Sequence, residues 1–83
     1  MKYEVVYRKP AERFLDAQTV KNRRRIMDAC DKLPNAGDRK QLTGHPEYRL
    51  RVGDFRILYF VVMNLVKVTV LAIGNRGDVY KRI

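Results

Sequence analysis

Three arginines in the stretch EYRLRVGDFRILYF (residues 47–60) could do chemistry on a phosphate. If Gly53-Asp54 is the two-residue loop of a β-hairpin, Arg51 stands directly opposite Arg56 and Arg49 shares their face. Two like charges facing each other cost about 0.2–1 kcal/mol. An anion that bridges both guanidiniums would reverse the sign of that interaction, and phosphate suits the planar fork of arginine. The spacing therefore predicts a phosphate-binding face.

Two further candidates lie in the C-terminal segment GNRGDVY. The expected register puts Arg56 near Ile73, so the loop that carries Arg76 should emerge beside the Arg51/Arg56 pair, and Tyr80 could fold back over the same corner. Guanidiniums can stabilise charge on phosphoryl oxygens, and a tyrosine can orient or deprotonate a 2′-hydroxyl. With one histidine and no carboxylate cluster suited to two metals, we expect no metal and no cofactor.

Size and charge limit the function classes. A chain of 83 residues is expected to form one domain over residues 1–83. Eighteen Lys and Arg against nine Asp and Glu give a net charge of +9, which suggests an anionic partner, first nucleic acid and then acidic protein. The lone Cys30 cannot form an intramolecular disulfide. The N-terminus lacks a signal-peptide core and no apolar run could span a membrane, so we expect a soluble, cytoplasmic protein without a membrane partner.

The N-terminal half predicts one strand and two helices. Residues 2–7 are β-prone, a short helix should run from Pro10 to about Ala17, and Thr19 should cap a second helix that ends at Pro34. Residues 35–40 are expected to be a loop. The apolar stripes of the two helices are Ala11, Phe14 and Leu15, then Ile26, Cys30 and Leu33, widened by Met27 and Ala29. The run Arg23–Arg25 is expected to be a solvated face, and His45, in a loop before Pro46, is not expected to be catalytic.

The C-terminal half alternates with a period of two, as strands do. In the expected register of the hairpin, Val52 faces Phe55, Leu50 faces Ile57 and Tyr48 faces Tyr59. A turn at Asn64 precedes a strand over residues 66–73. An even-residue turn would place Ile57, Tyr59 and Val61 on the same face as Val68, Val70 and Ala72. The predicted fold class is α+β in the order β-α-α-β-β-β, with both helices packed on one face of an antiparallel sheet.

The hairpin YRLRVGDFRILY, the valine-rich strand and GNRGDVY together resemble the RelE branch of the RelE/ParE superfamily of toxin–antitoxin toxins, across essentially the whole chain. The resemblance implies a microbial-ribonuclease-like fold and a metal-independent endoribonuclease that cleaves mRNA in the ribosomal A site. It implies a RelB-like antitoxin, contact with ribosomal RNA, and operator DNA bound only through the antitoxin complex.

The resemblance also implies roles for single residues. Arg49 and Arg51 match the basic pair that holds the phosphate backbone, and Arg56 matches the arginine that stabilises transition-state charge. Arg76 matches the basic residue that stabilises the leaving group or phosphate, and Tyr80 the tyrosine that stacks on RNA or activates the 2′-hydroxyl.

The sequence departs from the family pattern, and this leaves alternatives open. Studied members place lysine at the positions of Arg49 and Arg51; arginine keeps its proton, so a lysine base cannot be carried over and Tyr80 becomes the expected base. Thr43 stands where members often carry a basic residue. One alternative is a ParE-like inhibitor of DNA gyrase, although that branch generally lacks the arginine–tyrosine set. The other is a non-catalytic relative that acts only with its antitoxin.

Overall fold

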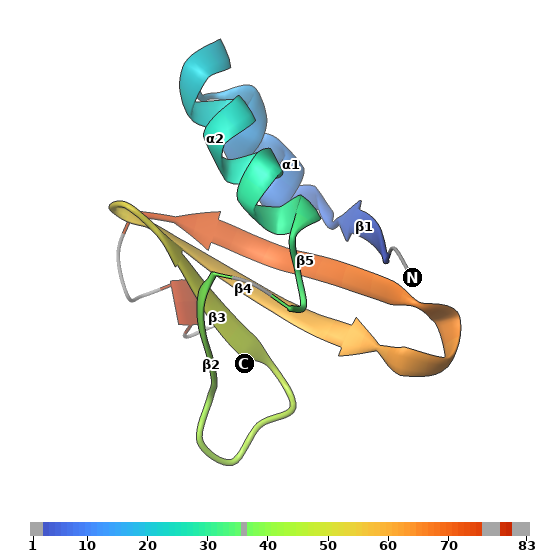
Figure 1. Cartoon of the computed structure of the whole chain (residues 1–83). Helices are drawn as coiled ribbons and strands as arrows, with labels where there is room; N and C mark the ends of the chain where they lie inside the picture. The colour runs from blue at the N-terminus through green and yellow to red at the C-terminus, as the bar shows by residue number, and fades with distance from the viewer. Residues whose placement is uncertain (1–2, 36, 76–78, 81–83) are drawn as a thin grey trace.

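The chain folds as a mixed five-stranded sheet with two helices on one face (Figure 1). The computed structural model describes residues 3–35, 37–75 and 79–80. In chain order the elements are β1 (Glu4–Tyr7), α1 (Lys9–Asp16), α2 (Val20–Asp31), β2 (Asp38–Gln41), β3 (Tyr48–Val52), β4 (Phe55–Val62), the 3-10 turn η1 (Met63–Leu65) and β5 (Lys67–Gly74). Within the described ranges, no helix is both long and apolar enough to cross a membrane.

Helix α2 begins where predicted, and the centre of its apolar stripe is buried as predicted, but one residue at the margin of the stripe is exposed. Thr19 caps α2, its hydroxyl accepting a hydrogen bond from the backbone N–H of Asn22 at 3.1 Å. Ile26 and Cys30 are fully buried, which confirms the central stripe and the core position of the cysteine. The prediction for Met27 is wrong: the residue is 37% exposed, because it lines a surface pocket with Tyr7 and Leu15 instead of packing in the core.

The arginine run on α2 is only partly a solvated face. Arg24 and Arg25 are exposed, but Arg23 is half-buried. Its Nε donates to the carbonyl oxygen of Leu15 at 3.0 Å and a terminal nitrogen donates to that of Gln18 at 3.4 Å. Arg23 therefore binds one carbonyl in the last turn of α1 and one just beyond it, where the helical hydrogen-bond pattern ends.

The sheet has one strand more than predicted and is mixed. Its order is β1-β5-β4-β3-β2; β1 is parallel to β5, and all other neighbours are antiparallel. The two helices carry the chain from β1, at one edge of the sheet, to β2 at the other edge. This long connection lets β5 return beside β1 in the parallel direction. The predicted loop over residues 35–40 is wrong in part, since Asp38–Gln41 pairs with β3. All four residues of β2 are exposed, so backbone hydrogen bonds rather than apolar alternation define this edge strand.

The predicted hairpin register is confirmed, with Arg51 opposite Arg56 and Tyr48 opposite Tyr59. The register between β4 and β5 follows the prediction only from Tyr59 onwards along β4. Tyr59 faces Val70 and Val61 faces Val68, but an irregularity between Leu58 and Tyr59 shifts the register by one residue.

This shift has two consequences. Ala72 faces Leu58, on the side of the sheet away from the helices, and Ile57 faces Ile73. Arg56 accordingly faces Gly74, so it lies near Ile73 as expected but pairs one residue further along β5. A bulge adds a residue to one strand, and with a side-chain period of two this exchanges the faces beyond it.

Apolar residues are buried on both faces of the sheet. The main core joins α1 and α2 to the face that carries Leu50, Ile57 and Tyr59. A smaller cluster on the other face contains Leu58, Ala72 and Val79, with Leu42, Leu71 and Tyr80 packed against it. Val79 and Tyr80 thus cover part of the face opposite the helices.

Candidate nucleic-acid interface

Three arginines share the sheet face opposite the helices, and we call this surface the arginine face (Arg49, Arg51 and Arg56). Arg51 and Arg56 are directly paired across β3 and β4. Their neighbours along the strands, Leu50 and Ile57, are buried in the main core, so alternation directs the arginines to the other side. Arg51 is exposed, whereas Arg49 and Arg56 are half-buried.

Two of these arginines are held by neighbouring groups. A terminal nitrogen of Arg49 lies 3.4 Å from both the carbonyl oxygen and the carboxylate Oδ1 of Asp38 on β2. A terminal nitrogen of Arg56 donates to the carbonyl oxygen of Asn75 at 3.1 Å. Arg56 therefore connects the arginine face to Asn75, the residue that follows β5.

Tyr80 lies beside the same surface. It packs against the Leu58/Ala72 cluster, and its phenol oxygen is buried without a hydrogen-bond partner among the described residues. Burial raises the pKa of Tyr80, while the charges of the three arginines oppose that rise and the carboxylate of Asp38 adds to it. An ordinary phenol is already protonated at neutral pH, and the net upward shift of the pKa opposes its ionisation further, so Tyr80 suits hydrogen bonding better than proton abstraction.

The structure thus brings four of the five predicted site residues to one face: Arg49, Arg51, Arg56 and Tyr80. Arg76 lies outside the described residues.

Sequence reasoning missed the contribution of β2 to this surface. Lys40 is directly opposite Arg49, and Asp38 is directly opposite Arg51, so both share the arginine face. Lys40 adds a fourth cation from an exposed position, and Asp38 adds the carboxylate that holds Arg49. The segment DRKQ is polar throughout, with no apolar residue to alternate, so its sequence cannot be told from that of a polar loop.

A basic side chain from the helices reaches the tip of the same hairpin. Gly53 has a φ of +60°, and a Cβ there would lie 2.5 Å from a terminal nitrogen of Arg25. The guanidinium of Arg25 therefore covers the β3–β4 turn, next to the strand ends that carry Arg51 and Arg56. Arg25 thus places a cation at the hairpin turn, beside the exposed carboxylate of Asp54.

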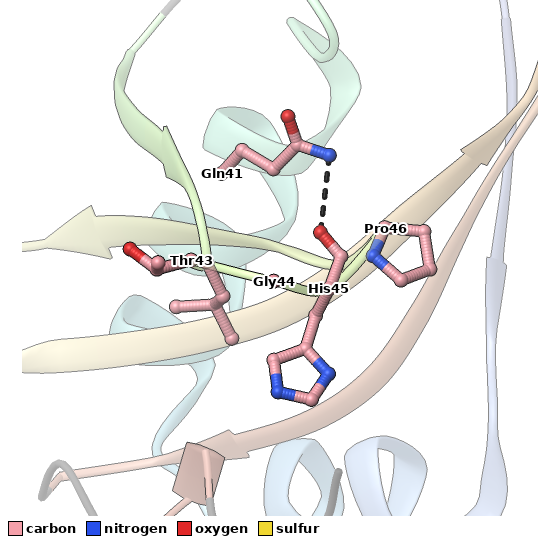
Figure 2. Close-up of a pocket in the computed structure, with 6 residues that line it drawn as sticks. Gln41, Thr43, Gly44, His45 and Pro46 are labelled. Atoms are coloured by element: carbon pink, nitrogen blue, oxygen red, sulfur yellow. Dashed lines mark hydrogen bonds between the residues drawn. The ribbon is translucent and has the colours of Figure 1, made fainter.

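The β2–β3 loop encloses an open hollow of about 450 Å³ (Figure 2). The side-chain amide of Gln41 donates to the carbonyl oxygen of His45 at 3.1 Å, while the imidazole points away from Gln41. Thr43 and His45 are both exposed. Across the part of the chain that the structure describes, no three His, Cys, Asp or Glu side chains gather as a metal site would require.

Comparison with solved structures gives clear relatives. RelE in the archaeal RelE–RelB complex of Pyrococcus horikoshii is 27% identical, with a TM-score of 0.74 over 93% of this chain and 98% of that one. The RelBE2 toxin–antitoxin complex of Mycobacterium tuberculosis matches at 19% identity, with a TM-score of 0.72 over 94% and 95% of the two chains. The isolated RelE toxin of Escherichia coli matches at 20% identity, with a TM-score of 0.67 over 96% and 93%.

The chain has the RelE fold. The match to RelE toxins covers essentially the whole chain, which confirms the resemblance noted in the sequence. No family model and no curated protein matches the sequence. In this RelE fold the arginine face belongs to the hairpin, and Tyr80 packs against the Leu58/Ala72 cluster on the same side of the sheet.

Proposed function

We propose that this chain is the toxin of a type II toxin–antitoxin pair, a cytoplasmic endoribonuclease that cleaves mRNA in the ribosomal A site. One observation carries the proposal: in a chain with the RelE fold, Arg49, Arg51, Arg56 and Tyr80 gather on a single sheet face. Folding alone does not favour an opposed pair of arginines, whereas a bound phosphate does.

The proposed reaction is an attack of a ribose 2′-oxygen on the adjacent phosphorus. The new bond joins the 2′-oxygen to phosphorus, and the bond from phosphorus to the 5′-oxygen breaks, leaving a 2′,3′-cyclic phosphate and a 5′-hydroxyl. The proton of the 2′-hydroxyl passes to water, and the leaving 5′-oxygen takes one from water. Neither step uses a metal ion.

Each residue has a distinct part in this reaction. Arg49 and Arg51 bind the phosphate backbone, and Arg56 stabilises the charge that develops on the phosphoryl oxygens. Tyr80 is protonated at neutral pH, as an ordinary phenol is, and burial raises its pKa further, so it orients the 2′-hydroxyl or stacks on a base rather than removing the proton. Arg76 stabilises the leaving group.

The proposed partners are an antitoxin and ribosomal RNA. The similar structures include RelE–RelB complexes, so a RelB-like antitoxin would inhibit this chain, and operator DNA would be bound through that complex. The net charge of +9 suits docking on ribosomal RNA, whose phosphates attract Lys and Arg without regard to sequence.

Primer extension on a translated mRNA after induction tests the target directly. Cuts at codon-related positions that require the ribosome are expected. A gyrase supercoiling assay run in parallel tests the ParE-like alternative: relaxed DNA together with intact mRNA would contradict the nuclease and favour gyrase inhibition.

Three variants test the site: Arg56→Ala, Arg76→Ala and Tyr80→Phe. Loss of one group that stabilises developing charge typically costs about 10²–10³ in rate, so growth arrest should be relieved in each. Arg13→Ala, on an exposed position of α1, removes the same charge away from the site and should leave arrest intact. Undiminished toxicity in all three variants would refute the assignment, and arrest without any cleavage would favour the non-catalytic alternative.

A further inference from the structure

A separate pocket of about 270 Å³ lies on the opposite face of the sheet from the arginines. Tyr48 and Tyr59 line it from β3 and β4, and both belong to the side of the sheet that carries the main core. Arg39 on β2 lines it as well; it is paired with the core residue Leu50 and therefore points to the helix side. The nuclease mechanism uses none of these side chains.

The walls of this pocket, which we call the tyrosine pocket, contain an unsatisfied polar group. Tyr59 is fully buried, and its hydroxyl has no hydrogen-bond partner among the described residues. A buried polar group without a partner destabilises a fold by about 1–3 kcal/mol and calls for an explanation. The ring of Tyr48 stacks on that of Tyr59 at 5.6 Å, which holds the phenol in place.

Arg39 is close enough to act electrostatically on this hydroxyl. Burial raises the pKa of Tyr59 to about 12, and the positive charge of Arg39 opposes the rise. The phenol is therefore protonated at neutral pH and can donate a hydrogen bond. Of the described residues that line the pocket, Arg39 alone carries a charge.

The rim of the pocket is apolar and exposed. Met63 lines it from the η1 turn and is 69% exposed; Leu65, in the same turn but outside the pocket lining, is 60% exposed. The hydroxyl of Tyr3 rests 3.6 Å from the sulfur of Met63. Tyrosine, methionine and arginine are the residue types enriched in the cores of protein–protein interfaces.

The volume is more suitable for a side chain than for a cofactor. Small-molecule sites usually measure about 300–1,000 Å³, and this pocket lies below that range. A nucleotide would bring a phosphate and need several cations, as the arginine face provides and this pocket does not.

We propose that the tyrosine pocket binds one apolar side chain of an acidic protein segment. A carboxylate of the segment pairs with Arg39, and a carbonyl or carboxylate oxygen accepts from the Tyr59 hydroxyl. That hydroxyl is closed off from water in the free chain, so binding requires a side chain of the wall to move aside. The proposal is independent of RNA cleavage, because the arginine face lies on the other side of the sheet.

Three blocked pentapeptides supply the probe: Glu-Glu-Phe-Glu-Glu, the same peptide with alanine at its centre, and Lys-Lys-Phe-Lys-Lys. Titration followed by NMR on the full chain should show the acidic phenylalanine peptide shifting the signals of Tyr48 and Tyr59. The alanine peptide measures non-specific attraction to a chain of charge +9. Equal affinity for the phenylalanine and alanine peptides, or shifts confined to the arginine face, would overturn the proposal.

Two variants separate a binding role from a structural one. Tyr59→Phe removes only the hydroxyl, so it should weaken the acidic peptide about two- to tenfold. It should leave thermal stability unchanged or raised, because the unpartnered group is gone. Arg39→Gln should weaken the peptide similarly, and Arg24→Gln, on an exposed position of α2, should not.

The remaining outcomes are equally informative. Peptide affinity unchanged in Tyr59→Phe and Arg39→Gln would refute the proposal. So would a short oligoribonucleotide that shifts Tyr48 and Tyr59 in place of the peptide, since it would make the pocket a base-stacking site. RNA cleavage by Tyr59→Phe should equal that of the wild type, so a failed peptide test leaves the nuclease proposal standing.

Discussion

Replacing Arg51 by glutamine should stabilise the fold while weakening RNA cleavage. Arg51 directly faces Arg56, and the guanidinium of Arg56 is held by the carbonyl of Asn75, so it is not free to turn away from its neighbour. Like charges opposed across an antiparallel pair cost about 0.2–1 kcal/mol. Asp38 also faces Arg51, but its carboxylate is paired with Arg49. Removing the Arg51 charge should therefore raise the free energy of unfolding by at most about that amount, or the melting temperature by at most about 8 °C for a domain of this size.

Salt dependence distinguishes charge repulsion from other causes. Arg51 is exposed, so the gain should be largest at low ionic strength and vanish in 1 M NaCl, where the Debye length falls to about 3 Å. Thermal or urea unfolding of the wild type, Arg51→Gln and Arg51→Lys measures it. The lysine variant keeps the charge and should match the wild type in stability.

Three outcomes would refute this reasoning. Arg51→Gln could prove less stable than the wild type, its gain could persist in 1 M NaCl, or Arg51→Lys could gain as much. Opposite changes in stability and cleavage are the expected signature of residues placed for binding rather than for folding.

Three further predictions concern the fold that positions the arginine face. Thr19→Ala should lower the free energy of unfolding by about 1 kcal/mol in urea unfolding, because α2 loses its N-cap, whereas Thr19→Ser should not. Gly53→Ala should cost at least about 1–2 kcal/mol by the same measurement, since an alanine is strained at φ +60° and its Cβ meets Arg25. Burial raises the pKa of Cys30 from 9.0 to about 12, so its contribution to stability is fully present below pH 9 and is lost as the pH rises towards 12; unfolding curves for Cys30→Ala should fall less steeply over that interval.

Several features could be predicted from the sequence because they depend on neighbours along the chain. Thr19 identified the start of α2, and the turn residues Gly53 and Asp54 set the β3–β4 register that opposes Arg51 and Arg56. Strict alternation then assigned the arginines to one face and Leu50 and Ile57 to the other. The net charge and the clustered arginines predicted an anionic binding partner without any knowledge of tertiary contacts.

Other features depend on contacts between distant segments. The irregularity at Leu58/Tyr59 moved Ala72 to the far face, and no local pattern marks such a bulge. The edge strand β2 lacks an apolar signal and exists through its backbone pairing with β3, so the roles of Asp38 and Lys40 at the arginine face stayed hidden.

The environment of the tyrosines was likewise a matter of tertiary structure. A base role for Tyr80 was a reasonable expectation from the surrounding arginines, but the direction of its pKa depends on how deeply the phenol is buried, and burial outweighs the arginines. For this protein, the sequence by itself determined the residue types, their alternation and their turns, because these are local. Burial, register beyond the bulge and the meeting of strand edges were decided only in three dimensions, since each results from packing between segments that the chain order does not place together.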